Sequence, residues 1–121
     1  MKRSASYSIA FFLPLCLLCG CRSYLVDLSV ENHTGSAIQL LEVDYPSASF
    51  GTDSLAVGAT YHYRIQVTQS GPLKVQYTEG PTHTVRQITG TELHEGQEGR
   101  VDVVLLPDGK AEFHPQLDEK H

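Results

Sequence analysis

Hydrophobic and polar residues alternate along most of the chain beyond residue 24. Val26, Leu28 and Val30 are separated by polar residues, and similar runs return further along. Because successive side chains of a strand point to opposite faces, each run predicts a strand with one buried face and one face in water. Gly, Pro, Asn, Asp and Ser separate the runs, and no stretch keeps the period of a helix. The pattern therefore predicts an all-β domain.

About seven or eight strands are predicted within residues 24–114, and residues 115–121 are expected to form a disordered tail. The weakly patterned range 83–88 is expected at the edge of a sheet. Pro107-Asp108-Gly109-Lys110 predicts a hairpin turn before the last strand. The predicted strands cover residues 24–31, 37–45, 47–52, 61–68, 73–78, 83–88, 100–105 and 111–114.

The predicted strand at residues 37–45 changes phase partway along. Ile38 and Leu40 share one face, whereas Leu41 and Val43 share the other. A strand with a period of two can move its hydrophobic residues to the other face only at a local break. We therefore expect a β-bulge between Leu40 and Leu41, or a strand that switches sheets there.

Two four-residue segments, Leu55–Gly58 and Leu93–Gly96, are similar, and each precedes a long alternating run. A buried Leu followed by a Gly turn suits a chain that crosses between two sheets, because Leu fills the end of the core and Gly tolerates a positive φ. Two such crossings favour a two-sheet sandwich over a meander. The alternative is that a common four-residue pattern occurs twice by coincidence.

The length of the region and its number of strands suit a single immunoglobulin-like antiparallel β-sandwich. The region has no Trp and no Cys, so it lacks the Cys and Trp core of antibody domains. By its pattern, and not by a motif, it resembles the wider group of immunoglobulin-like and transthyretin-like bacterial modules. Without Cys, packing and hydrogen bonds alone must hold the domain together.

The first 20 residues have the pattern of an export signal. Lys2 and Arg3 precede an apolar run over residues 9–18, which is shorter than the roughly 20 residues that a membrane-spanning helix needs. The run ends in Leu18-Cys19-Gly20-Cys21. This segment resembles the lipobox of bacterial lipoproteins, in which an aliphatic residue, a variable residue and a small residue precede an invariant Cys.

The lipobox resemblance implies cleavage between Gly20 and Cys21. It also implies a thioether-linked diacylglycerol on Cys21 and a further fatty acid, such as palmitate, on the new amine. Residues 21–23 would form a lipidated tether that holds the protein to membrane lipid. Arg22 replaces the Asp that retains enteric lipoproteins at the inner membrane, which favours the outer membrane with the domain facing the periplasm. The alternative is an ordinary secretory signal followed by a free thiol.

Charge and motifs exclude several classes of function. The net charge is −5 and becomes −7 if Lys2 and Arg3 leave with the signal. An acidic chain argues against nucleic acid as a partner, because neutralisation of phosphates dominates that binding. The domain has no Gly-x-Ser-x-Gly motif and no Cys nucleophile. We therefore expect neither enzyme activity nor a cofactor.

A candidate binding loop runs from Pro46 to Asp53. It follows Tyr45, is rich in small residues and carries Phe50 and Gly51. Loops on rigid scaffolds are favoured for binding, and an edge strand beside this one could accept a partner strand. A wider aromatic set is more simply explained by core packing; it adds Tyr61, Tyr63 and Tyr77.

Histidine offers the alternative chemistry. His62, His83 and His114 fall on neighbouring predicted strands and are the best candidate ligands for copper or zinc. No His-x-His motif supports them, and each is also explained as a solvated or packing residue. The sequence thus predicts a lipid-anchored binding or structural module with an unknown envelope protein or peptide as its partner. Periplasmic metal handling is the alternative function.

Overall fold

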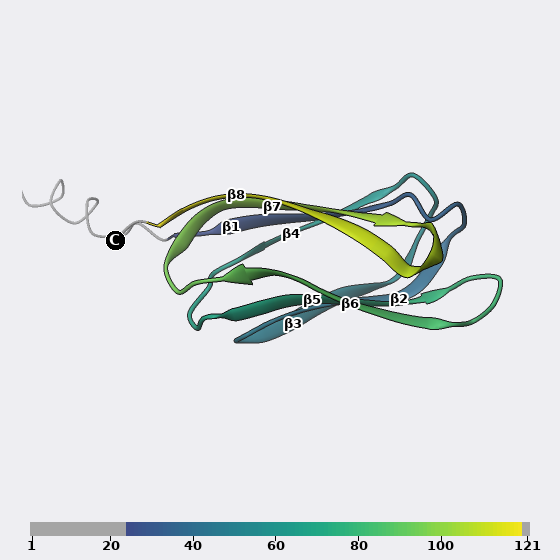
Figure 1. The fold of residues 1–121 in the computed structure, drawn as a ribbon, viewed down its shortest axis with the longest axis horizontal. Helices are drawn as coiled ribbons and strands as arrows, with labels where there is room; N and C mark the ends of the chain where they lie inside the picture. The colour runs from purple at the N-terminus through teal and green to yellow at the C-terminus, as the bar shows by residue number, and fades with distance from the viewer. Residues whose placement is uncertain (1–23, 120–121) are drawn as a thin grey trace, which may run out of the picture.

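Eight strands form two four-stranded sheets that face each other in a computed structural model, which describes residues 24–119 (Figure 1). The chain enters the first strand and leaves the last one at the same end of the molecule. The strands are β1 (Val26–Asn32), β2 (Ile38–Tyr45), β3 (Ala48–Leu55), β4 (Thr60–Ile65), β5 (Gly71–Glu79), β6 (Val85–Leu93), β7 (Gln97–Leu106) and β8 (Lys110–Glu119).

The strand order confirms the predicted all-β sandwich. Sheet A has the order β4-β1-β7-β8, and sheet B has the order β3-β2-β5-β6. All neighbouring strands are antiparallel except β1 and β7, which are parallel. The weakly patterned sixth strand lies at an edge of sheet B, as predicted. The 3₁₀ turn Pro107–Gly109 joins β7 to β8, where the sequence predicted a hairpin turn.

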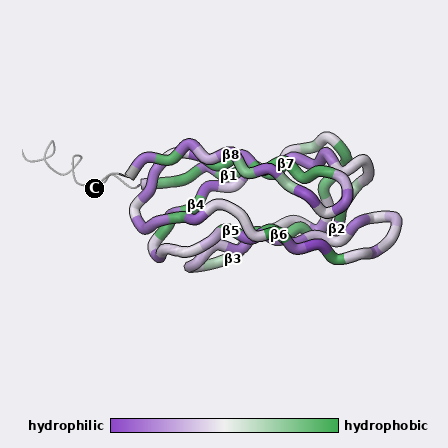
Figure 2. Tube along the Cα trace, in the orientation of Figure 1, coloured by the Kyte–Doolittle hydropathy of each residue, from purple (hydrophilic) through white to green (hydrophobic). Residues whose placement is uncertain are grey.

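The core lies between the inner faces of the two sheets and is almost wholly aliphatic. Figure 2 shows the alternation of hydrophobic and hydrophilic residues along the strands. Burying each Val, Leu or Ile side chain contributes about 1.5–3 kcal/mol, so this layer supplies most of the driving force for folding. The innermost residues include Val26, Val30, Ile38, Leu41, Leu73, Val75, Tyr77, Leu93, Val101, Val103 and Leu105.

The predicted β-bulge is present in β2. The register between β2 and β5 shifts by one residue between Gln39 and Glu42, and Leu40 adopts a φ of 53°. Leu40 is 63% exposed, whereas Ile38 and Leu41 are buried. The bulge therefore turns Leu40 to the outside, so that the hydrophobic residues on both sides of it reach the same core.

The chain crosses between the sheets at both repeated Leu-x-x-Gly segments, as predicted. Leu55 and Leu93 are buried, and each ends a strand of sheet B. Gly58 and Gly96 have φ angles of 79° and 81°, which suit the third position of a type II turn. Each glycine also donates its backbone N–H to a second crossing segment. Gly58 donates to the Asn32 carbonyl at the end of β1, and Gly96 donates to the Val67 carbonyl after β4.

Asn32 fastens two crossings together at one end of the sandwich. It is fully buried, and its Nδ2 donates to the Ser36 carbonyl at 2.8 Å and to that of Leu55 at 3.0 Å. Its Oδ1 accepts from the backbone N–H of Thr34 at 3.0 Å. A buried amide with all its groups bonded stabilises the fold, since each group left unpaired would cost about 1–3 kcal/mol.

The last strand is longer than the sequence predicted, and the expected disordered tail from residue 115 is wrong for its first part. Residues 115–119 continue β8 and pair with Gln97 to Val101 of β7. Leu117 packs against the core, which favours pairing over fraying. Pro115 is tolerated because β8 is an edge strand. Residues 120 and 121 lie outside the described residues.

Replacing Asn32 by Ala should lower the free energy of unfolding by about 2–4 kcal/mol, because the buried Leu55 carbonyl loses the Asn32 donor and the Thr34 N–H loses its acceptor. Chemical denaturation of the full chain measures this. Gln39→Ala is the control, because the Gln39 side chain is exposed on the next strand; its effect should stay within about 0.5 kcal/mol. Equal effects of the two substitutions would contradict the role given to Asn32.

Candidate functional site

The candidate binding loop proves to be a tight turn and an edge strand. Tyr45 pairs with Ala48, so only Pro46 and Ser47 form the turn, and residues 48–55 continue as β3. The strand expected at residues 47–52 is confirmed, but the interpretation of residues 46–53 as a long loop is wrong. Pro46 favours a turn because its φ is fixed. The residues after it alternate Phe50 with small polar residues, and this segment pairs with β2.

Four aromatic side chains meet where β3 and β4 form neighbouring edges of the two sheets. We call Tyr45, Phe50, Tyr61 and Tyr63 the aromatic seam. The Phe50 ring stacks on Tyr63 with centroids 4.1 Å apart, on Tyr61 at 5.9 Å, and lies 6.1 Å from Tyr45. Tyr63 remains 45% exposed. Partial burial raises the pKa of the Tyr45 hydroxyl, and the nearby Tyr63 adds to this.

The seam joins the predicted site to two residues of the other sheet. Tyr45, Pro46, Phe50 and Gly51 were expected together, and the structure places Tyr61 and Tyr63 beside them. Tyr77, the remaining member of the aromatic set, is fully buried in the core. The seam therefore packs along one side of the sandwich and leaves part of Tyr63 accessible.

Gly51 is required by close backbone approach at the β-bulge. A Cβ at this position would collide with the Leu41 carbonyl oxygen. The Gly51 carbonyl accepts a hydrogen bond of 2.9 Å from the Tyr61 hydroxyl in sheet A. The surface over Gly51 is hollowed, and the hollow is lined by residues of β2 and β3 that include Leu40, Glu42, Ser49, Phe50, Thr52 and Asp53.

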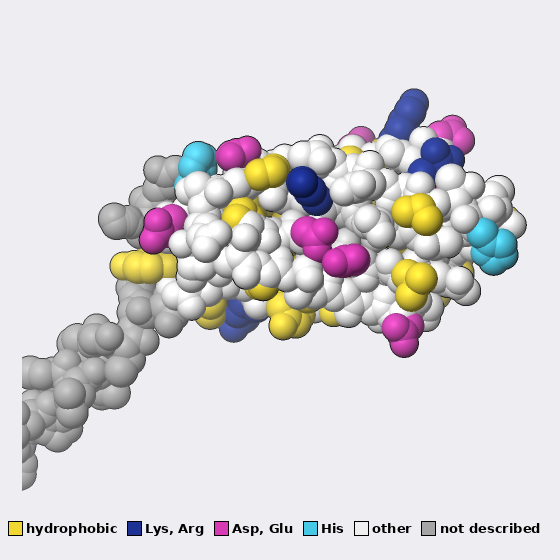
Figure 3. All heavy atoms as spheres, turned by 90° about the horizontal axis from the view of Figure 1, so that it is seen from below, with side chains coloured by type: hydrophobic (Ala, Val, Ile, Leu, Met, Phe, Trp, Pro, Cys, Tyr) yellow, Lys and Arg dark blue, Asp and Glu magenta, His cyan; other side chains and the backbone are white. Residues whose placement is uncertain are grey.

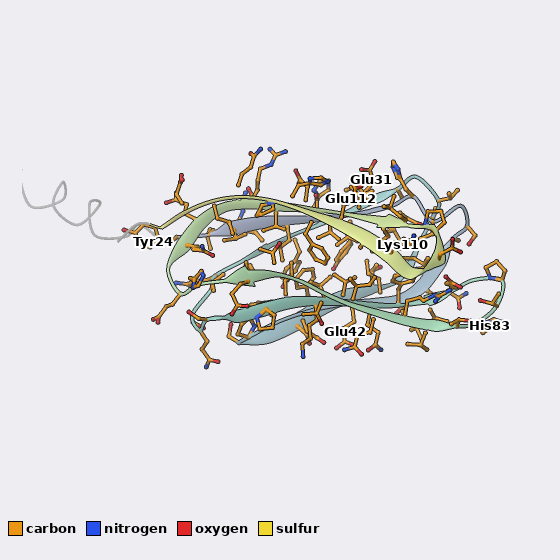
Figure 4. All side chains as sticks on the ribbon, viewed as in Figure 1. Tyr24, Glu31, Glu42, His83, Lys110 and Glu112 are labelled. Atoms are coloured by element: carbon orange, nitrogen blue, oxygen red, sulfur yellow. The ribbon has the colours of Figure 1, made fainter. Side chains whose placement is uncertain are left out.

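Acidic side chains lie beside this hollow on the outer face of sheet B. Glu42 points away from the sandwich in Figure 4, and Asp44 and Asp53 follow its alternation on β2 and β3. Figure 3 shows this face, with acidic side chains next to each other near its middle and no continuous hydrophobic patch. A hydrogen bond shared with Asp44, with repulsion between the two carboxyl groups, raises the pKa of Glu42.

The outer face of sheet A carries a second polar group of residues, of which only His62 was singled out from the sequence. A shallow depression there is lined by Asp27, Ser29, His62, Arg64, Arg100 and Asp102, among others. Arg64 Nε contacts Asp27 at 2.8 Å, and Arg100 Nη2 contacts Asp102 at 3.0 Å. The antiparallel pairing of β1 with β4 places Asp27 beside Arg64, and the parallel pairing of β1 with β7 places Asp27 beside Arg100 and Ser29 beside Asp102.

Asp102 is the most strongly held carboxylate of this face. Ser29 Oγ donates to its Oδ1 at 2.7 Å, and this hydrogen bond is the main cause that lowers the pKa of Asp102. Burial opposes this effect and raises the pKa, while Arg100 and the nearby His114 lower it further. The Ser29 hydroxyl is thus committed to a carboxylate on an open face of the sheet.

The three candidate metal ligands are not brought together. His62 lies on β4 and His114 on β8, the two edges of sheet A, so two strands and about 14 Å separate them. His83 lies in the turn between β5 and β6, at the end of sheet B (Figure 4). Zinc needs ligands about 2 Å from one point. Within residues 24–119 no group of three or more His, Cys, Asp or Glu residues could hold a metal ion.

Cys21, Gly20 and the segment before them lie outside the described residues. Across residues 24–119 no helix is long and apolar enough to cross a membrane. No protein-family model, curated protein or solved structure matches the chain. The aromatic seam and the free edge of β3 are therefore identified as the candidate site from geometry alone.

The free energy of unfolding should decrease in acid, in part because Asp102 becomes protonated. Its pKa is lowered from the ordinary value of 3.8, so the folded chain binds fewer protons than the unfolded chain in this range. The stabilisation is present above the unfolded pKa and is lost as the pH falls through the folded pKa. In Ser29→Ala the unfolding free energy should fall less steeply with pH below about 4. Denaturation curves from pH 5 to pH 2 measure both slopes, and equal slopes would contradict this.

Phe50→Leu should lower the free energy of unfolding by about 1–2 kcal/mol, because it keeps most of the apolar contact and removes the ring stacking on Tyr61 and Tyr63. Chemical denaturation gives the value. Val85→Ala, at a hydrophobic position that is 60% exposed, is the control and should change stability by less than about 0.5 kcal/mol. A loss in Phe50→Leu no larger than that of the control would show that the seam does not join the sheets.

Proposed function

We propose that the chain is a lipid-anchored protein of the bacterial cell envelope, held at the outer membrane and facing the periplasm. Its β-sandwich acts as a non-catalytic binding or structural module. The observation that carries the anchor is Leu18-Cys19-Gly20-Cys21, at the end of an apolar run that begins after two cations. Two or three acyl chains on one residue hold a protein to a bilayer durably, whereas a single chain does not.

The position of β1 suits a short tether. Val26, the first residue of β1, lies five residues after Cys21. An extended chain of that length spans at most about 18 Å, so the end of the sandwich where β1 begins would stay close to the membrane. The turn at His83 lies at the opposite end of the molecule (Figure 4) and would point into the periplasm.

Two features support the binding role: the aromatic seam and the exposed edge of β3 beside it. Phe50 stacks on both Tyr61 and Tyr63, which restricts the three rings, and Tyr63 is partly exposed. On the other sheet, the Ser29 hydroxyl is bonded to Asp102, and the candidate histidines lie far apart. The edge of β3 is therefore the surface best suited to a partner. Recognition by a rigid aromatic group beside an open strand requires no chemistry from the module itself.

Intact-mass spectrometry of the full chain, made in a bacterium with two membranes, tests the anchor. The expected product begins at Cys21 and carries the added mass of a diacylglycerol and a fatty acid. Cys21→Ser should remain unprocessed and unlipidated. Cys19→Ala is the matched control and should be processed as the natural chain is, because Cys19 occupies the variable position.

A mature product that begins elsewhere, or that has no lipid mass on its first residue, would overturn the anchor. Separation of inner and outer membranes then tests the location. Recovery of the lipidated chain with the inner membrane would contradict the outer-membrane assignment alone and leave the anchor in place.

A further inference from the structure

The sandwich has four edge strands, and three of them are protected against pairing with another chain. β8 carries Pro115 in its middle, which removes a backbone donor. β4 has only six residues and carries Arg64, whose side chain is 65% exposed. β6 carries Arg86 and a register irregularity opposite Pro72 and Lys74. Short length, charge, proline and bulges are among the usual means by which edge strands avoid association.

β3 carries fewer of these protections. It has eight residues, with no Pro, Lys or Arg among them, and Asp53 is its one charged residue. Ser49, Gly51 and Asp53 are exposed along it. The Gly51 carbonyl points out of sheet B, because it accepts from the Tyr61 hydroxyl of sheet A. An added strand would share this acceptor with Tyr61 or displace the hydroxyl. An edge of this length can form a ladder of main-chain hydrogen bonds with an added strand.

The two faces beside β3 differ in chemistry. On the inner side an added strand would meet the aromatic seam, with Phe50 and the exposed part of Tyr63. On the outer side it would meet Asp53 and, across the hollow over Gly51, Glu42. Because Gly51 has no side chain, a long cationic side chain on the added strand can extend over it to the Glu42 carboxylate.

We propose that β3 accepts an extended segment of a partner protein as a fifth strand of sheet B. The segment has Lys or Arg at the alternate positions that face the outer side, and aliphatic or aromatic residues at the positions between them. The proposal specifies the partner of the binding module proposed above and rests on that binding role. It does not depend on the lipid anchor.

Charge decides between such a segment and a second copy of this chain. Two copies joined symmetrically through β3 would put the two Asp53 residues on adjacent strands, with Glu42 of each copy one strand further out on the same acidic face. Like charges on adjacent strands destabilise a sheet, and Glu42 and Asp44 already repel each other within one copy. A cationic segment would relieve this repulsion, so it is the occupant that the surface favours.

Binding of designed peptides to the full chain in detergent tests the proposal. The probe is a ten-residue peptide that alternates Lys with Val and Tyr, and its control has Glu in place of every Lys. Fluorescence anisotropy should show binding of the Lys peptide, with the Glu peptide about tenfold weaker or more. Equal binding of the two peptides would overturn the proposed charge recognition.

Two further peptides test the main-chain ladder. N-methylation of every second amide removes the donors on one side of the Lys peptide, and methylation of the other amides removes those on the opposite side. Since the two sides of a strand carry alternate N–H groups, only one of these peptides should lose binding. If both bind as the unmethylated peptide does, strand addition is wrong and only ion pairing remains.

Matched variants locate the site. Glu42→Gln with Asp53→Asn should weaken binding of the Lys peptide about tenfold. Glu31→Gln with Glu112→Gln removes the same charge from the opposite face of the molecule (Figure 4) and should leave binding unchanged. Equal losses in both pairs would show a response to overall charge and would overturn the assignment to β3.

Hydrogen exchange and sedimentation complete the test. The bound Lys peptide should protect the backbone amides of β3, and protection confined to β4, β6 or β8 would overturn the choice of edge. Self-association of the chain through β3 in the absence of peptide would overturn the choice of occupant. Failure of lipidation at Cys21 would leave these results unaffected, so the two proposals fail separately.

Discussion

The buried amide of Asn32 is the contact on which the sandwich depends. The sandwich over residues 24–119 contains no Cys, so other contacts must hold its two sheets together where the chain crosses between them. Asn32 bonds the crossing after β1 to the one after β3. Gln97 has the corresponding place near the other end, where its Oε1 accepts from the His94 N–H at 2.9 Å. Asn32 and Gln97 are the buried polar residues among those described. Hydrophobic packing has no preferred direction, so these hydrogen bonds help to set the relative position of the two sheets.

The features that could be predicted from the sequence are those that depend on residues close together in the chain. Alternation located the strands, the change of phase at Leu40 located the bulge, and the repeated Leu-x-x-Gly segments located two crossings between the sheets. The extension of β8 beyond Pro115 was missed because proline and polar residues suggest a chain end, whereas pairing with the first half of β7 overrides that preference.

The candidate site shows the same limit. Tyr45, Phe50 and Gly51 could be chosen from composition, but the stacking of Phe50 on Tyr63 joins strands of different sheets, and no local pattern encodes that meeting. The parallel pairing that places Ser29 beside Asp102 is equally remote in sequence. The segment Asn32-His33-Thr34 matches a glycosylation motif, yet here Thr34 donates to a buried Asn32 and the motif describes a turn.

The parallel pairing of β1 with β7 has a consequence for the order of folding. The two strands are joined by contacts between residues 73 positions apart, such as Ser29 with Asp102. During synthesis β1 has no central neighbour until most of the chain has followed it, because its only other partner is the edge strand β4. A nascent chain of this topology is slow to become compact, and under the export proposed above that delay would keep the chain unfolded for threading through a narrow channel.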